Sequence, residues 1–173
     1  ERPGERDERA ETFAVLEAAT VLYEQALAEK QDARANLVAR GITEGTIKHF
    51  RVGYALKEWR TLSDTLLAQG FSEAALMHAG LIKRPDTEDG STEKKPYDRF
   101  RGRIMFPIRD ASGRVIAFSG RIFEDDPVHP QAKYLNSPEG PLFDKSRALY
   151  GIDDAKMGVR HLGFSMLVEG QVD

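Results

Sequence analysis

Cysteine is absent from the 173 residues, and its absence excludes two kinds of structure. Neither a disulfide scaffold nor a zinc site with thiolate ligands can form within these residues. A metal site made of histidines and carboxylates is still open to the chain, but the histidines are scattered and lack the i, i+4 spacing of helical metal ligands. We therefore expect each of them to be structural or solvated: His49, His78, His129 and His161.

Long apolar runs are absent too. No run of about 18 apolar residues is available to span a bilayer, and residues 1–4 (ERPG) resemble neither a signal peptide nor a native start. An apolar content of 40% is ordinary for a globular protein, and a length of 173 residues predicts one domain or one and a half. We interpret the sequence as a fragment of a longer protein, and the lack of cysteine as compatible with the cytoplasm.

Lysine is absent from the most basic part of the sequence. The net charge of −3 would argue against a nucleic-acid partner if the charge were evenly spread, but residues 99–121 hold a single acid, Asp110, and a group of arginines. These are Arg99, Arg101, Arg103, Arg109, Arg114 and Arg121. The guanidinium fork grips phosphate at two points, which favours a phosphate-binding surface. Outward-facing, solvated strand residues would give the same pattern, and periodicity does not decide between the two interpretations.

The first 82 residues predict a layer of helices. Apolar side chains at 3-4-3-4 spacing give one stripe on a helix of roughly 18 residues. The stripe consists of Phe13, Leu16, Thr20, Tyr23 and Leu27. Shorter helices are predicted at 32–40, from an N-cap at Thr43, at 62–69 and at 73–79, with glycines placed for C-caps at 41, 70 and 80. Residues 83–96 have no apolar side chain and several turn formers, which predicts a mobile surface loop.

After residue 97 the apolar period changes to two, which is typical of strands. Ile104, Phe106 and Ile108 alternate with other residues, residues 110–113 (DASG) supply turn chemistry, and residues 114–118 begin a return strand. The pattern predicts an antiparallel hairpin. Because Pro107 has no N–H to donate, its strand is expected to lie at an edge, or to turn that position away from pairing.

Strand alternation would place Arg101, Arg103 and Arg109 opposite the apolar residues, on an arginine-lined face of the sheet. Arg109 and Arg114 flank the turn and are expected to be solvated. Several aromatic residues of this region could stack on bases, although core positions are the favoured interpretation: Tyr97, Phe100, Phe106, Phe118 and Tyr134. A further short strand is predicted at 133–136, and a helix within 146–156.

Two carboxylates four residues apart stand at the end of the sequence. Residues 164–168 (FSMLV) predict a buried strand, which would place Glu169 at its carboxyl end, with Gly170 allowing a tight turn. Open α/β sheets bind ligands at that edge, so Glu169 and Asp173 are candidate magnesium ligands, and Glu169 a candidate general base. A complete magnesium site needs further acids, which we expect beyond residue 173. Taken by itself, the motif is equally typical of a turn followed by a helix.

A longer set of motifs resembles the catalytic core of bacterial DnaG-type DNA primases. It comprises residues 97–110 (YDRFRGRIMFPIRD), 113–121 (GRVIAFSGR), 133–139 (KYLNSPE), 143–145, 149–151 and the pair Glu169-Gly170. Residues 10–82 resemble the helical start of the same core more loosely, mainly at 33–34 and 40–41. The resemblance implies an α+β fold, in which a helical layer is followed by a small, mostly antiparallel sheet that leads into a truncated α/β TOPRIM domain. The implied divisions are a linker at 1–9, an N-terminal subdomain at 10–155 and the start of the TOPRIM domain at 156–173.

The same resemblance implies a function. Members of the family make short RNA primers from NTPs on single-stranded DNA during replication in the bacterial cytoplasm, at the replication fork, and depend on Mg²⁺ or Mn²⁺. Residues that match template- and nucleotide-binding positions are Arg34, Arg99, Arg101, Arg121, Lys133, Asn136 and Lys145. Glu169 matches the catalytic acid, and Glu169 and Asp173 match metal ligands. Phosphoryl transfer depends mainly on positioning and on neutralisation of charge, which such residues supply.

The sequence departs from the family at Ser119, at Asp144 and at residues 171–172. Asp144 puts a negative charge beside Lys145, which bears on the role of that lysine. An upstream zinc domain, the later TOPRIM acids and a C-terminal domain that binds the replicative helicase are expected outside these residues, so the fragment alone should be inactive. Two alternatives stay open: a non-catalytic module that binds single-stranded nucleic acid, and the primase half of a phage or plasmid primase-helicase.

Overall fold

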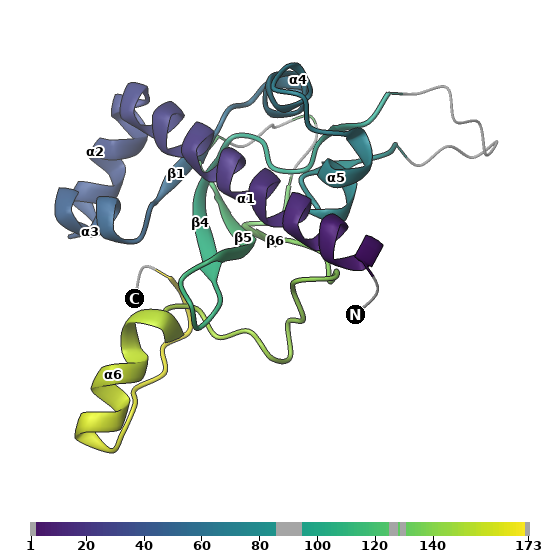
Figure 1. Ribbon diagram of the computed structural model, residues 1–173. Coiled ribbons are helices and arrows are strands. Elements are labelled where there is room, and N and C mark those ends of the chain that lie inside the picture. Colours follow the sequence, from purple (N-terminus) through teal and green to yellow (C-terminus); the bar gives the residue numbers. More distant parts are fainter. Residues whose placement is uncertain (1–2, 86–94, 125–127, 129–130, 172–173) are drawn as a thin grey trace.

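The computed structural model describes residues 3–85, 95–124, 128 and 131–171 (Figure 1). The helices are α1 (Pro3–Glu29), α2 (Gln31–Ala39), α3 (Glu44–His49), α4 (Thr61–Ala68), α5 (Glu73–His78) and α6 (Ile152–Leu162). The strands are β1 (Gly53–Ala55), β2 (Ile82–Lys83), β3 (Tyr97–Asp98), β4 (Arg103–Arg109), β5 (Val115–Ile122) and β6 (Tyr134–Asn136). The predicted α+β class is confirmed. No described helix has the length and apolar character needed to cross a membrane.

The predicted hairpin is the centre of the main sheet. Its strand order is β1-β4-β5-β6, each pair is antiparallel, and Arg103 lies opposite Ile122 at one end of the hairpin. β4 is not an edge strand, because β1 pairs with its first residues, 103–105. On the side of β4 that faces β1, no described strand pairs with the residues after Met105. Pro107 is one of these residues. A residue without an N–H is tolerated where one side of a strand has no partner.

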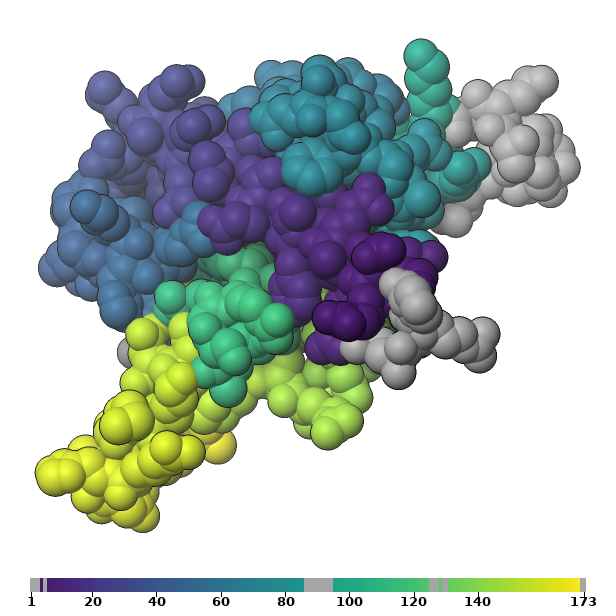
Figure 2. Space-filling model, viewed as in Figure 1, coloured from purple at the N-terminus to yellow at the C-terminus, as the bar shows by residue number. Residues whose placement is uncertain are grey.

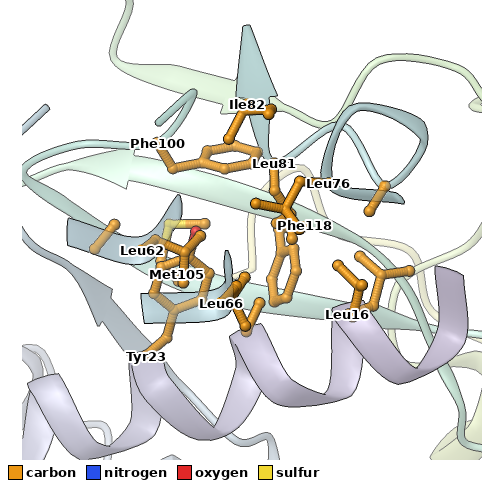
Figure 3. Close-up of a cluster of buried hydrophobic side chains, with 14 of the residues drawn as sticks. Leu16, Tyr23, Leu62, Leu66, Leu76, Leu81, Ile82, Phe100, Met105 and Phe118 are labelled. Carbon is orange, nitrogen blue, oxygen red and sulfur yellow. The ribbon is translucent and has the colours of Figure 1, made fainter. Parts of the chain in front are cut away.

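The long N-terminal helix covers the sheet. α1 has 27 residues, more than the stripe predicted, and the stripe residues Leu16, Thr20, Tyr23 and Leu27 are buried as expected. The Tyr23 ring meets Phe118 of β5 edge-on, with 5.3 Å between ring centroids. Figure 3 shows the side chains of α1, α4, α5 and the sheet meeting in this cluster. The apolar face of α1 therefore packs into the largest core cluster, as its apolar spacing predicts.

A second core cluster packs against Ile104 and Phe106 of β4. Leu37 of α2 and Ile47 of α3 are buried with Ile104 and Phe106 of β4. Strand alternation puts Met105, which belongs to the first cluster, on the opposite face. β4 is therefore buried on both faces.

Burial on both faces overturns the prediction of an arginine-lined face along β4. Arg103 is only 1% exposed, and its guanidinium donates to the Gly120 carbonyl and to Gln131 Oε1, at 3.2 Å each. Arg109, which we expected to be solvated, has a side chain only 13% exposed. The expectation fails because alternation assumes one open face, whereas neighbouring elements cover both faces of this strand.

The short helices have the caps that the sequence predicts, and two that it does not: Ser72 Oγ accepts from the Ala75 N–H at the start of α5, and the other comes from β3. The Thr43 side chain accepts a hydrogen bond from the Thr46 N–H at 3.1 Å, and glycines 41, 70 and 80 have positive φ at the helix ends. At the start of α4, the Asp98 carboxylate of β3 accepts from the backbone N–H groups of Leu62 and Ser63, at 2.8 and 3.0 Å. Burial raises the pKa of Asp98. This contact ties the start of α4 to the segment that precedes β4.

Arg109 fastens α6 to the body of the molecule. Its Nε lies 2.9 Å from Asp153 and its Nη2 lies 2.6 Å from Asp154, both in the first turn of α6. His49 Nε2 lies 3.0 Å from Asp154 on the other side. Arg114, by contrast, pairs with Asp110 and has a side chain 55% exposed, as expected for a residue beside the turn. The helix predicted within 146–156 exists, but it begins at residue 152.

The buried strand predicted at 164–168 is wrong. The segment has no strand partner in the part of the chain that the structure describes, and Met166 and Leu167 are 85% and 75% exposed. It runs back beside α6, which projects from the body (Figures 1 and 2). A strand needs a neighbour for its backbone groups, and an apolar pentapeptide cannot supply one for itself.

Residues 83–96, predicted to be a mobile loop, are only partly described. Lys83 at one end pairs with Tyr97 in the small β2–β3 sheet. Residues 86–94 lie outside the described residues.

The packing of α1 on β1 gives a direct test of the fold. A Cβ atom at Gly53 would lie 2.5 Å from the Tyr23 Cβ and 2.7 Å from the Tyr23 carbonyl carbon. We therefore expect Gly53→Ala to lower the free energy of unfolding by about 1–3 kcal/mol, as overpacking does, in urea titrations followed by circular dichroism. Gly45→Ala is the matched control, because its nearest neighbour is Thr43 Oγ1 at 3.7 Å. It should be neutral or stabilising by up to about 1 kcal/mol. Equal losses in both variants would contradict this account of α1 packing.

The attachment of α6 gives a second test. Arg109→Gln leaves the Asp153 side chain, which is 7% exposed, without its charge partner. We expect the amides of α6 to exchange at least about tenfold faster, a local loss of roughly 1.4 kcal/mol, while core amides stay protected. Arg114→Gln removes a more exposed ion pair and should leave exchange in α6 unchanged. Unchanged exchange in Arg109→Gln would show that α6 is held by other contacts.

Candidate nucleic-acid interface

Two predicted site residues meet where β5 and β6 pair. Arg121 of β5 lies opposite Tyr134 of β6, and the Ile122 N–H donates to the Lys133 carbonyl at 2.8 Å. The Arg121 guanidinium and the Lys133 ammonium lie 6.0 and 5.9 Å from the centroid of the Tyr134 ring. Tyr134 is 39% exposed, so the ring and the two cations form one surface.

Arg99 connects this surface to the segment before β4. Its Nε and Nη2 approach the Asn136 carbonyl at 3.4 and 3.3 Å, which holds the guanidinium against the end of β6. Burial lowers the pKa of Arg99, but an arginine stays protonated at neutral pH. The side chain of Asn136 is exposed next to it.

Arg101 lies in the same segment before β4, beside two aromatic rings. Its Nη1 donates to the Asp98 carbonyl at 2.6 Å, and its guanidinium lies 4.0 Å from the centroid of the Trp59 ring and 5.0 Å from that of Tyr97. Burial lowers the pKa of Arg101 as well. Arg101 is thus held against Trp59 and Tyr97, and Arg99, two residues earlier in the sequence, is held against the end of β6.

Charge distinguishes these four cations from six other arginines of the described chain. Acidic partners neutralise Arg34 (Glu44), Arg51 (Glu17 and Glu24), Arg60 (Asp64), Arg84 (Glu73), Arg109 (Asp153 and Asp154) and Arg114 (Asp110). Within the described residues, no carboxylate lies within ion-pair distance of Arg99, Arg101, Arg121 or Lys133. We call these four residues the unpaired cations. Their charge is available to an anion such as phosphate.

Arg34 and Lys145 do not contact the unpaired cations in the described structure. Arg34 lies on α2, and its Nη2 is 2.6 Å from Glu44 Oε2 at the start of α3. Lys145 is exposed in the turn that follows Phe143. The Asp144 carboxylate accepts from the N–H and the Oγ of Ser146, at 2.9 and 2.6 Å, and these hydrogen bonds lower its pKa. Asp144 therefore forms its hydrogen bonds with Ser146. The roles predicted for Arg34 and Lys145 stay predictions.

Glu169 lies apart from any acidic cluster. It is exposed in a turn and lines a cavity of about 240 Å³ between α6 and the segment that follows it, together with Tyr150, Val159 and Met166. Asp173 lies outside the described residues. Among the described residues, no three His, Cys, Asp or Glu side chains come close enough to hold a metal ion. A hard divalent cation needs several oxygen ligands, so the described residues do not fit a magnesium site.

The aromatic residues divide into core and surface. Phe100, Phe106 and Phe118 are buried, as the favoured interpretation predicts, but Tyr134 is exposed and Tyr97 half-buried, each beside a cation. Trp59, 56% exposed, is a surface residue that the sequence reasoning did not consider. Its only signal in the sequence is its rarity, because it is the single tryptophan.

Solved structures share this fold. One is the RNA polymerase domain of Mycobacterium tuberculosis primase DnaG in complex with a double-stranded DNA oligomer that carries a 6-nucleotide overhang; its TM-score is 0.82, its identity 34%, and the match covers 93% of this chain and 48% of that one. Another is a DnaG primase catalytic domain bound to ssDNA, with a TM-score of 0.73 and 34% identity, covering 88% and 47% of the two chains. A third, from Aquifex aeolicus, contains zinc-binding and RNA polymerase domains, with a TM-score of 0.83 and 28% identity, covering 95% and 38%.

Sequence comparison gives the same result. A DNA primase of Pseudomonas aeruginosa is 41% identical over 164 residues, which cover 93% of this chain and 23% of the relative. The chain thus spans about a quarter of the length of the curated relatives it matches. The family model described as "DNA primase catalytic core, N-terminal domain" matches residues 22–156. The chain belongs to the family of the DNA primase catalytic core, N-terminal domain.

Proposed function

We propose that this chain is the template- and nucleotide-binding part of a DNA primase, an enzyme that synthesises short RNA primers on single-stranded DNA during bacterial replication. The observation that carries the proposal is the group of unpaired cations: Arg99, Arg101, Arg121 and Lys133 lie in or next to β5, β6 and the segment before β4, and no carboxylate neutralises them in the described residues. The names of its relatives and the DNA in two of the similar structures support it.

The surface has the parts that a single strand requires. Guanidinium groups bind phosphate oxygens in pairs, and exposed aromatic rings such as Tyr134 stack on bases without regard to sequence. The exposed amide of Asn136 offers a donor and an acceptor between them. These side chains bind and orient the strand and the incoming nucleotide, which is most of what a protein contributes to phosphoryl transfer.

The chemistry itself would need residues that this chain does not supply. We propose that Glu169 is one acid of a metal-binding and catalytic set completed by Asp173 and by acids elsewhere in the longer protein. An upstream zinc domain and a C-terminal domain for the replicative helicase belong to the same proposal. A zinc-binding domain occurs in the Aquifex aeolicus structure, which supports it.

One alternative rests on a specific observation. The described residues gather cations but no cluster that could hold a metal ion, so binding without chemistry is what this part of the chain is equipped to do. A protein that used the unpaired cations only to hold single-stranded nucleic acid would have the same surface. Primer synthesis by the longer protein separates the two functions.

The cationic surface is tested by a double variant. We expect Arg101→Ala with Lys133→Ala to weaken binding of a single-stranded oligonucleotide and to lower the slope of log affinity against log salt by about 1.4, since each lost phosphate contact removes roughly 0.7. Fluorescence anisotropy over a salt series measures both quantities. Lys48→Ala is the charge control, because Lys48 is exposed on α3, away from β5 and β6 (Figure 1). A slope unchanged in the double variant, or lowered equally in the control, would mean that the strand binds elsewhere.

Glu169 is tested in the longer protein, where the remaining acids are present. Glu169→Gln should reduce primer synthesis by at least about a hundredfold, because it removes the negative charge at constant size, while template binding and thermal stability stay near wild type. A template-directed incorporation assay with labelled NTPs measures synthesis. The 173-residue chain alone should make no primers with Mg²⁺ or Mn²⁺. Activity within a few-fold of wild type in the variant, or primers from the chain alone, would refute the proposed role.

A further inference from the structure

A cavity of about 80 Å³ lies where α1, α4 and β1 meet. Its walls are mostly apolar and include Leu22 and Ala26 of α1, Leu62 of α4, and Leu56 after β1. Leu22 and Ala26 are half-buried and Leu56 is exposed, so the cavity opens to solvent between the two helices. One water needs roughly 10–15 Å³ of such space, and an engineered cavity of roughly 150 Å³ binds benzene, so this cavity fits a group of about four or five heavy atoms.

A tyrosine hydroxyl in the wall of this cavity has nothing to bond. The Tyr23 side chain extends from α1 into the core (Figure 3), and its hydroxyl is buried without a hydrogen-bond partner among the described residues. Burial and, to a smaller extent, the charge of Asp98 raise the pKa of Tyr23 well above its ordinary value, so the hydroxyl stays protonated at neutral pH and can donate. A buried hydroxyl without a partner costs free energy, and a ligand that accepts from it would remove that cost.

Asp98 lines the same cavity and supplies an acceptor. Its buried carboxylate accepts one hydrogen bond on each oxygen, from the N–H groups of Leu62 and Ser63. A carboxylate has about four acceptor sites, so each oxygen can accept one more hydrogen bond. A hydrogen bond to an ionised group is roughly twice as strong as a neutral one. A donor bound in the cavity would therefore have a strong acceptor in the same space as the Tyr23 hydroxyl.

We propose that this cavity is a binding site for a small uncharged alcohol with a branched apolar body. A hydroxyl can accept from Tyr23 and donate to Asp98 at the same time, whereas an ether oxygen only accepts. The apolar atoms of the ligand would lie against the leucine and alanine side chains of the wall. Size and chemistry of the cavity thus point to the same ligand class.

The site is separate from the unpaired cations, none of which lines the cavity, and the inference does not rest on the proposed function. Asp98 nevertheless connects the two. Its backbone carbonyl accepts from Arg101 Nη1 at 2.6 Å, and its carboxylate caps α4. A ligand in the cavity therefore contacts the residue that orients one of the unpaired cations.

Isobutanol is the probe, and its isomer isopropyl methyl ether is the matched control, because the ether has the same atoms but no O–H to donate. We expect isobutanol to shift the NMR signals of amides around Tyr23, Ala26 and Leu62 with one saturable midpoint, on the order of millimolar for a ligand of this size. NOEs from its methyl groups to the methyl groups of Ala26 and Leu62 should locate it. The ether should bind at least about fivefold more weakly, since it forms no hydrogen bond to Asp98.

Variants of α1 test the site itself. Tyr23→Phe keeps the ring and its contact with Phe118 but removes the unpaired hydroxyl, so it should fold with undiminished stability and bind isobutanol about three- to tenfold more weakly. The ether should lose affinity by the same factor, because it too accepts from Tyr23. Ala26→Leu fills the cavity and should abolish binding, whereas Ala28→Leu, at an exposed position of α1, should not change it. Thermal melts followed by circular dichroism check that each variant is folded.

Each outcome decides the proposal. Shifts that do not saturate, NOEs to other parts of the chain, or undiminished binding to Ala26→Leu would overturn the site. Equal affinities for alcohol and ether, with binding unchanged in Tyr23→Phe, would overturn the assignment of Tyr23 and Asp98 as the polar pair. If Ala26→Leu does not fold, the ether and Tyr23→Phe comparisons decide alone. Oligonucleotide binding is measured separately, so the proposed function can stand or fail independently.

Discussion

The close packing of α1 on the sheet is the constraint on which the rest of the structure depends. The backbone of Tyr23 approaches β1 so closely that only glycine fits at position 53, and the Tyr23 ring fills the space in front of Phe118. This contact sets β1 beside β4, and the β4–β5 register then carries Arg121 to its place opposite Tyr134. The buried core thus positions the cations at the surface.

Neutralisation of charge separates structural arginines from those available to a ligand. Arg109 is nearly buried between two aspartates and fastens α6, and Arg51 bridges Glu17 and Glu24 on α1. The unpaired cations instead bond to backbone carbonyls or lie against aromatic rings, which orients them without cancelling their charge. Their attraction for an anion is therefore retained, and it should decrease as salt concentration rises.

The C-terminal part of the chain is held differently from the body. α6 has no buried residue, and ion pairs at its first turn make its described contacts with β4 and α3. The segment that follows exposes Phe164, Met166, Leu167 and Val168. Exposed apolar side chains in such density are typical of a surface that other residues cover. Glu169 follows α6 in the chain. Its position relative to the unpaired cations therefore depends on how the ion pairs of Arg109 orient that helix.

The sequence by itself determined the elements whose signals are local. The stripe on α1, the N-cap at Thr43 and the alternation around the 110–113 turn correctly predicted helices and a hairpin, because apolar period and capping chemistry act over a few residues. The family resemblance singled out Arg99, Arg101, Arg121 and Lys133, which have no acidic partner among the described residues, and also Arg34 and Lys145, whose roles stay predictions. Only the tertiary structure decided which arginines face the core, which are neutralised and which are free, since that depends on partners far away in the sequence, such as Asp153 for Arg109. It also decided that residues 164–168 form no strand among the described residues, and that Trp59 lies beside Arg101, because pairing and stacking require a neighbour that no local pattern specifies.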